Sequence, residues 1–190
     1  MVKKVGILGG TFDPPHIGHL IIANECLFQA SLDEVWFMPN NVPPHKQKTD
    51  DVSNREREDM VRLAIMNHPR FKLEPIELKR EGTSYTVDTM RLLREQNPDV
   101  DFYFIIGGDM IEYLPKWYKI EELVKMVQFL GVKRPNYSDQ SSFPVKLLDI
   151  PEINLSSTQI RERIQKRQSI RYLVSDSVRE YIEENGIYGS

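Results

Sequence analysis

The sequence predicts an α/β fold, a doubly wound parallel sheet with helices on both faces and further helices at its C-terminal end. Two observations support this expectation. Short apolar stretches, typical of buried strands, alternate along the chain with stretches of helical hydrophobic spacing. Near the C-terminus, two serine-led capping patterns predict closing helices.

The first part of the chain predicts three extended segments and three helices. Lys3–Leu8 is nearly all apolar, as expected for a strand covered on both faces. The other two extended segments are Glu34–Met38 and Phe71–Leu78, the latter interrupted at Pro75. The helices are Leu20–Ala30, a segment that begins at the capping box of Ser53 and Glu56 and stops near His68, and Val87–Gln96.

The second part predicts three more strands and four helices. The strands are Asp101–Ile106, Val127–Val132 and Val145–Asp149. Short helices are expected around Ile111–Leu114 and Ile120–Met126, and capped ones from Ser156 to about Lys166 and from Ser177 to Gly186. We expect one domain over residues 1–190, with about 155–190 as a helical C-terminal extension.

Composition limits the classes of function. The 190 residues, 40% of them hydrophobic, suffice for one sizeable core. A net charge of −3 argues against nucleic-acid binding and against a polybasic membrane surface. No apolar run is long enough to span a bilayer, and the N-terminal run is too short for a signal peptide. We therefore expect a cytoplasmic protein without nucleic-acid or membrane partners.

The sequence offers no evident metal site. Cys26 is the single cysteine, which excludes an internal disulfide and a cysteine cluster, and its apolar helical surroundings predict a buried structural thiol. A zinc site at His16 and His19 is disfavoured, because no carboxylate stands at metalloprotease spacing and His45 and His68 have no fixed relation to the pair.

The stretch from Val5 to His19 carries the main functional signal. A glycine turn follows an apolar strand, and two histidines three residues apart open a helix. Glycine lets the backbone approach a ligand closely, and a helix start favours an anion. The stretch predicts a phosphate site at which the histidines donate hydrogen bonds, in preference to the alternative that they only cap or pack the helix.

A second glycine turn is expected beside the first. In a doubly wound sheet the first and fourth strands lie side by side at the switch point, where ligands bind. This places Gly9–Thr11 next to Gly107–Asp109. The helix start at Ser156–Thr158 is a third candidate phosphate site, followed by Arg161 and Arg163, although spacing does not tell whether it reaches the crevice. Neither GxxxxGK[ST] nor GxGxxG is present, which excludes a P-loop and disfavours a redox dinucleotide.

Two motifs together carry a family resemblance. GGTFDPPHIGH at 9–19 and SSTQIR at 156–161 resemble the HxGH nucleotidyltransferase superfamily, which has a Rossmann-like nucleotidyltransferase fold. Within it the whole chain most resembles bacterial nicotinate-nucleotide adenylyltransferases. The distinguishing segments are PNNVPPHK (39–46), GTSYTVDT (82–89), IIGGDM (105–110), KWY (116–118) and GVKRP (131–135).

The resemblance implies a reaction in NAD biosynthesis: ATP and nicotinate mononucleotide give deamido-NAD and pyrophosphate, assisted by Mg²⁺, which would arrive with ATP. It implies catalytic roles for His16, His19 and Arg161, and it is compatible with a homodimer. The implied ATP-binding residues are Gly9, Thr11, Phe12, Gly107, Asp109, Ser156, Ser157 and Thr158. The implied acceptor-binding residues are Asn40, Lys46, Thr83, Tyr85, Thr86, Trp117 and Tyr118.

Residue chemistry supports part of the acceptor site independently. An aromatic face at Trp117 suits a flat pyridine ring, and the polar turn Thr83–Thr86 suits a carboxylate. Packing alone remains an alternative for Trp117, and a solvated charge remains one for Lys46. Three further interpretations stay open: a related superfamily enzyme acting on phosphopantetheine or transferring a cytidylyl group, preference for the amide nucleotide, and a nucleotide-binding regulatory protein.

Overall fold

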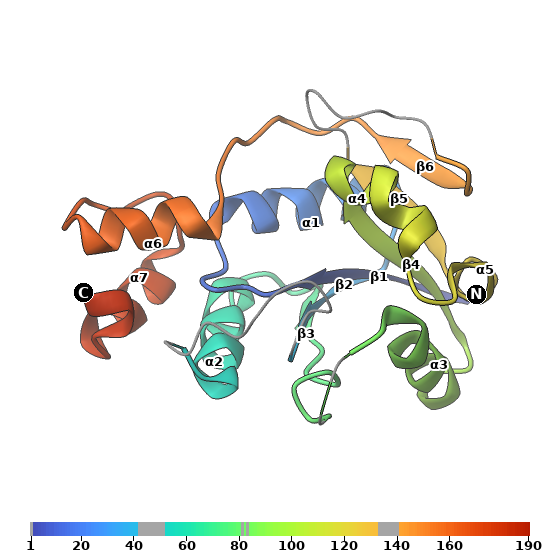
Figure 1. Cartoon of the computed structure of the whole chain (residues 1–190), viewed down its shortest axis with the longest axis horizontal. Helices are drawn as coiled ribbons and strands as arrows, with labels where there is room; N and C mark the ends of the chain where they lie inside the picture. The colour runs from blue at the N-terminus through green and yellow to red at the C-terminus, as the bar shows by residue number, and fades with distance from the viewer. Residues whose placement is uncertain (1, 42–51, 81, 83, 133–140) are drawn as a thin grey trace.

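The computed structural model describes residues 2–41, 52–80, 82, 84–132 and 141–190. Its centre is a six-stranded sheet in the order β3-β2-β1-β4-β5-β6, in which every neighbouring pair is parallel (Figure 1). The strands are β1 (Lys3–Gly10), β2 (Glu34–Pro39), β3 (Phe71–Leu73), β4 (Val100–Gly107), β5 (Gln128–Val132) and β6 (Val145–Leu148). This confirms the predicted doubly wound sheet.

Apart from two short 3-10 helices, the helices also follow the expected order. They are α1 (Ile17–Gln29), α2 (Asn54–Ile65), α3 (Thr86–Gln96), α4 (Gly108–Tyr113), η1 (Leu114–Lys116), α5 (Ile120–Leu123), α6 (Ser157–Gln165), α7 (Asp176–Glu184) and η2 (Ile187–Gly189). The 3-10 helices η1 and η2 were not predicted, and α6 and α7 come after the last strand. Among the described residues, we find no helix with the length and apolarity needed to cross a membrane.

The apolar core divides between the two faces of the sheet. Cys26 and Leu27 of α1 and Val61 of α2 belong to one buried cluster, whereas Met90 of α3 and Leu123 of α5 belong to another. Helices on both faces explain why β1 and β4 are apolar without alternation, since neither side of these strands faces water.

The C-terminal helices have a cluster of their own. Buried residues of α6, α7 and η2, among them Ile160, Val178 and Ile187, gather around Met60 of α2. Figure 1 shows α6 and α7, in orange and red, at the end of the molecule that lies away from α3 and α5. The extension therefore packs onto the fold through α2.

The order of the strands produces the expected switch point. β1 pairs with β2 on one side and with β4 on the other, with Leu8 opposite Ile105 and Gly10 opposite Pro39. The carboxyl ends of β1 and β4 therefore lie next to each other. This brings the first glycine turn beside Gly107, as the sequence predicts.

Several predicted boundaries need correction: α4 begins at Gly108 instead of near Ile111, α5 ends at Leu123 instead of near Met126, and three others differ as follows. The extended segment after Phe71 is a strand only to Leu73, because a hydrogen-bonded turn starts at Pro75, whose carbonyl accepts from the Leu78 N–H at 3.0 Å. The helix predicted from Leu20 begins three residues earlier, at Ile17. The cap predicted at Ser177 is wrong.

The last helix begins earlier than the pattern at Ser177 suggests. The Ser175 hydroxyl accepts a hydrogen bond from the Val178 N–H, so Ser175 is the N-cap and Asp176 lies in the first turn, near the positive end of the helix dipole. Ser177 followed by Glu180 matches the capping-box pattern, but both residues already lie inside the helix.

We predict that Cys26 resists thiol reagents in the folded protein. Its side chain is fully buried, which confirms the predicted structural thiol, and burial raises the pKa of the Cys26 thiol to about 12. At pH 8 the reactive thiolate is therefore scarce. Titration with a chromogenic disulfide reagent should detect no rapidly reacting thiol in native protein and one per chain in denaturant. Rapid labelling of the native protein would contradict this expectation.

Candidate active site

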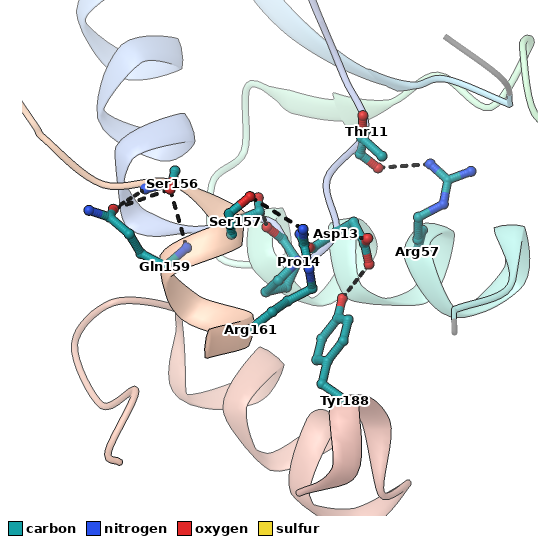
Figure 2. A network of polar contacts seen from close by, with 10 residues as sticks. Thr11, Asp13, Pro14, Arg57, Ser156, Ser157, Gln159, Arg161 and Tyr188 are labelled. Carbon is teal, nitrogen blue, oxygen red and sulfur yellow. Dashed lines mark hydrogen bonds and ion pairs between the residues drawn. The ribbon is translucent and has the colours of Figure 1, made fainter. Parts of the chain in front are cut away.

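Residues 11–16 form the loop between β1 and α1, here called the β1–α1 loop, and other elements hold its backbone. Figure 2 shows three backbone carbonyls of the loop, each of which accepts a hydrogen bond from a side chain that is distant in sequence. The donors and acceptors are Arg57 Nη1 and Thr11 O at 2.7 Å, Arg161 Nη1 and Asp13 O at 2.7 Å, and Ser157 Oγ and Pro14 O at 2.8 Å. Helices α2 and α6 thus fix the path of the loop.

The Asp13 side chain is the buried anion of this loop. Only 5% of the residue is exposed, and its Oδ1 accepts a hydrogen bond from the Tyr188 hydroxyl at 2.6 Å. Its Oδ2 lies 3.7 Å from Arg161 Nη1. Burial, followed by the charge of Asp13, raises the pKa of Tyr188, so this hydroxyl stays protonated and remains a donor.

Phe12 adopts an uncommon backbone conformation inside the loop. Its φ is +50°, a region that bulky residues rarely occupy, and its side chain is almost fully buried. The ring packs edge-on against His19, with 4.9 Å between centroids, and against Phe37. A Cβ at Gly10 would stand 3.1 Å from the Phe12 ring, so glycine is needed there for close approach.

The two histidines form one unit at the start of α1. His16 is the N-cap residue, and its backbone N–H donates to Nδ1 of His19 at 3.1 Å. The two rings stack with centroids 3.7 Å apart. Because Nδ1 of His19 accepts, its proton in the neutral ring is on Nε2, which makes that atom a donor. The pair therefore shares one face of the helix start.

Gly18 explains the spacing of the histidine motif. A Cβ at this position would lie 3.0 Å from Cε1 and Nδ1 of His16. The His16 ring is itself buried and rests on His19, so it has little room to move away. Glycine therefore lets the imidazole lie flat along the helix start.

The start of α6 reaches the β1–α1 loop, which spacing alone left open. Ser156 is its N-cap, with its hydroxyl accepting from the Gln159 N–H and the Gln159 side chain accepting from the Ser156 N–H. The Ser157 hydroxyl is bound to the loop, and Thr158 Oγ1 accepts from Arg161 Nη2 at 3.3 Å. The structure thus brings Ser157 and Arg161 into contact with the loop, with Ser156 and Thr158 beside them at the start of α6.

The second glycine turn lies where the switch point predicts. Gly107 ends β4 and is the N-cap of α4, and Asp109 is the second residue of that helix. Gly9 is the second-last residue of β1 and lies opposite Met38 of β2. Both walls of the predicted crevice therefore stand at the carboxyl edge of the sheet.

The predicted acceptor residues divide into two groups. Tyr85, the N-cap of α3, and Tyr118 are both partly exposed, and their ring centroids lie 4.6 Å apart. Trp117 instead packs edge-to-face against Phe104 and Phe129, at 5.8 and 6.1 Å between centroids. In this structure the tyrosines, more than the tryptophan, present an open aromatic surface.

The remaining acceptor candidates are placed in part. Thr86 is the first residue of α3, and the Asn40 N–H donates to the carbonyl of Gly10 at 2.9 Å. Lys46 and Thr83 lie outside the described residues. Among the described residues, we find no group of three or more histidine, cysteine or acidic side chains arranged to hold a metal ion.

Sequence reasoning missed two residues of this network, Arg57 and Tyr188. Arg57 is 5% exposed, and burial lowers the pKa of its guanidinium, an effect that the charge of Asp13 opposes. Helical spacing could have revealed it, since it shares the buried face of α2 with Met60 and Val61. Tyr188 has no such signal, because its contact to Asp13 spans 175 positions.

Comparisons with known proteins agree with this geometry. The model of the cytidylyltransferase-like family matches residues 7–163, which include the β1–α1 loop and the start of α6. The nicotinate-nucleotide adenylyltransferase of Bacillus subtilis (strain 168) is 54% identical over 189 residues, covering 100% of both chains.

Two solved structures share the fold. The Plasmodium falciparum nicotinic acid mononucleotide adenylyltransferase complexed with NaAD has a TM-score of 0.80 at 22% identity. The same enzyme complexed with APC has a TM-score of 0.77 at 21% identity. Each comparison covers 98% of this chain and 97% of the other.

We predict that Gly18→Ala weakens binding of a non-hydrolysable ATP analogue roughly tenfold, because the added methyl displaces the His16 ring. Alanine favours a helix interior over glycine by about 1 kcal/mol, so the melting temperature should not fall in proportion. Calorimetric titration and thermal unfolding measure the two effects separately. Unchanged affinity for the analogue would show that the ring is not held by this contact.

Proposed function

The chain belongs to the cytidylyltransferase-like family, and we propose that it is a nicotinate-nucleotide adenylyltransferase of NAD biosynthesis. It transfers the adenylyl group of ATP to nicotinate mononucleotide, and deamido-NAD and pyrophosphate are formed. The choice of acceptor rests on the full-length relative from Bacillus subtilis, at 54% identity. The structure supports the class of reaction through one observation, the stacked pair of His16 and His19 at the switch point.

The histidine pair suits transfer of a nucleotidyl group. The phosphate of the acceptor nucleotide attacks the α-phosphorus of ATP, and pyrophosphate leaves in line with the attack. The acceptor itself supplies the nucleophile, so the protein has no covalent step to perform. Its task is to place fixed hydrogen-bond donors against the negative charge on the phosphate oxygens. The Nε2 donor of His19 is fixed by its hydrogen bond with the His16 backbone, and His16 is fixed by the stack.

ATP is proposed to lie along the carboxyl edge of β1 and β4. Its triphosphate meets the start of α6, where the helix dipole and the charge of Arg161 both favour an anion. Arg161 also positions the β1–α1 loop, because its Nη1 donates a hydrogen bond to the carbonyl of Asp13. The proposed ATP contacts are Gly9, Thr11, Phe12, Gly107, Asp109, Ser156, Ser157 and Thr158.

The acceptor is proposed to lie between the start of α3 and the segment after η1. Tyr85 and Tyr118 offer aromatic area to a pyridine ring. The helix start at Thr86 offers N–H groups to the nicotinate carboxylate. Trp117, partly buried against the core, is proposed to shape the pocket, and Asn40, Lys46 and Thr83 complete the proposed set.

A divalent cation completes the proposal. Mg²⁺ commonly binds through substrate phosphates and water, so the triphosphate itself supplies its ligands and the cation neutralises part of the phosphate charge. We further propose one nucleotidyltransferase domain over residues 1–190 with a helical extension from about 155, a homodimer, and a cytoplasmic location, where ATP and pyridine nucleotides are available.

The proposal predicts a strict choice among acceptors. Release of pyrophosphate from ATP is measured with nicotinate mononucleotide, nicotinamide mononucleotide and phosphopantetheine, each at the same concentration. We expect the highest kcat/KM with nicotinate mononucleotide, because the carboxylate is the group that the helix start at Thr86 can recognise. A several-fold preference for the amide, or turnover with phosphopantetheine alone, would overturn the assignment of the acceptor. No turnover with any acceptor would favour a regulatory protein.

His16→Ala should lower kcat by roughly 100-fold or more, because it removes a fixed donor and the stacking partner of His19. His68→Ala is the matched control, since this imidazole also stacks on a ring, that of Phe71, with centroids 3.7 Å apart, but at the opposite edge of the sheet. The control should retain wild-type turnover. Equal loss in both variants would point to instability instead of chemistry.

A further inference from the structure

The last turn of the chain reaches into the β1–α1 loop. Tyr188, two residues before Ser190, places its hydroxyl 2.6 Å from Oδ1 of Asp13. Figure 2 shows this ring rising from the C-terminal helices toward the carboxylate. None of the roles assigned above uses this contact.

The turn that carries Tyr188 has a defined and unusual backbone. Tyr188 has a φ of +62°, which costs an aromatic residue conformational energy, and it stands between Gly186 and Gly189, which also have positive φ. The neighbouring Ile187 is 4% exposed, and the Ser190 hydroxyl donates to the carbonyl of Ile182 at 2.9 Å. Surrounding contacts therefore hold the ring in place over Asp13.

The position of Arg161 beside Asp13 indicates what the hydrogen bond from Tyr188 does. Arg161 Nη1 lies 2.7 Å from the Asp13 carbonyl and 3.7 Å from the Asp13 carboxylate, so two acceptors of one residue compete for the same nitrogen. A carboxylate is the stronger acceptor of the two. The Tyr188 hydroxyl holds the carboxylate through Oδ1, which keeps Oδ2 at 3.7 Å from Arg161 Nη1 and leaves that nitrogen on the backbone carbonyl, where it fixes the path of the loop.

We propose that Tyr188 is a positioning residue for ATP: by binding the Asp13 carboxylate it keeps Arg161 on the loop backbone and the β1–α1 loop in the shape that receives the triphosphate. The inference rests on the proposed adenylyltransferase function and adds to it a role for the C-terminal turn. Nicotinate mononucleotide, which is assigned to the α3 side, should be bound independently of Tyr188.

The test compares two tyrosine-to-phenylalanine variants within the C-terminal helices. Tyr188→Phe removes only the hydroxyl that binds Asp13. Tyr181→Phe is the matched control, because its hydroxyl also lies near an aspartate, Asp59, at 3.3 Å, but on α2 outside the site. Steady-state kinetics with each substrate varied, calorimetry with a non-hydrolysable ATP analogue, and melting temperatures are measured for both variants and for the wild type.

We expect Tyr188→Phe to raise the KM for ATP and the Kd of the analogue roughly tenfold, with the KM for nicotinate mononucleotide unchanged. Tyr181→Phe should leave all three constants at wild-type values. In an Asp13→Asn background the effect of Tyr188→Phe should shrink, because the charged acceptor through which it acts is gone.

Several results would overturn the inference. These are wild-type affinity for ATP in Tyr188→Phe, equal weakening of both substrates, the same loss in Tyr181→Phe, or an undiminished effect in the Asp13→Asn background. The proposed function fails separately: wild-type protein would then release no pyrophosphate from ATP and nicotinate mononucleotide, and the inference would fall with it. Active wild-type protein together with an unaffected Tyr188→Phe would remove the inference alone.

Discussion

The site depends on one constraint, that the β1–α1 loop is held by donors from outside itself. Its carbonyls at Thr11, Asp13 and Pro14 accept hydrogen bonds from side chains of α2 and α6. Phe12, with its positive φ, adopts a conformation that costs of order 1 kcal/mol or more, so the loop would not choose this shape alone. The surrounding hydrogen bonds hold the loop in this conformation, and the position of His16 and His19 depends on it because His16 ends the loop and His19 directly follows it in α1.

A chain of hydrogen bonds continues from this loop toward α3. Arg57 donates to Asn54 Oδ1, Asn54 to Asn41 Oδ1, and Asn41 to the carbonyl of Arg80, at 2.7, 2.7 and 2.5 Å. The Arg80 guanidinium then donates to Thr89 Oγ1, whose hydroxyl lies 2.8 Å from the buried Glu77 carboxyl. Burial raises the pKa of Glu77, opposed by its hydrogen bond with Thr89 and by the charge of Arg80. The loop proposed for ATP and the helix proposed for the acceptor are therefore parts of one polar framework.

Local patterns predicted the sheet, its switch point and most helices, because strand burial, helical spacing and caps depend on neighbours in sequence. The histidine pair was predictable for the same reason, since His16 and His19 are three residues apart. Arg57 was within reach of the same reasoning, as a buried position on the apolar face of α2. Tyr188 was not, because no local pattern encodes a partner 175 residues away. The interruption at Pro75 was predicted but the end of the strand at Leu73 was not, and the cap at Ser175 was missed because Ser177 offered a competing capping pattern.

The C-terminal helices belong to the site for a physical reason that the motifs alone do not give. Arg161 and Ser157 reach the loop from α6, and the carbonyl of Leu173, between α6 and α7, accepts from the Ile17 N–H at 2.9 Å, at the first turn of α1. These donors and acceptors meet backbone groups, so their geometry depends on the path of both segments and not on a single side chain. A fold ending at β6 would keep both glycine turns, both histidines and Arg57, yet it would lose Ser157 and Arg161, two of the three side chains that hold the loop before the histidines. The extension is thus the part of the chain that converts a helix start with two imidazoles into a site of defined shape.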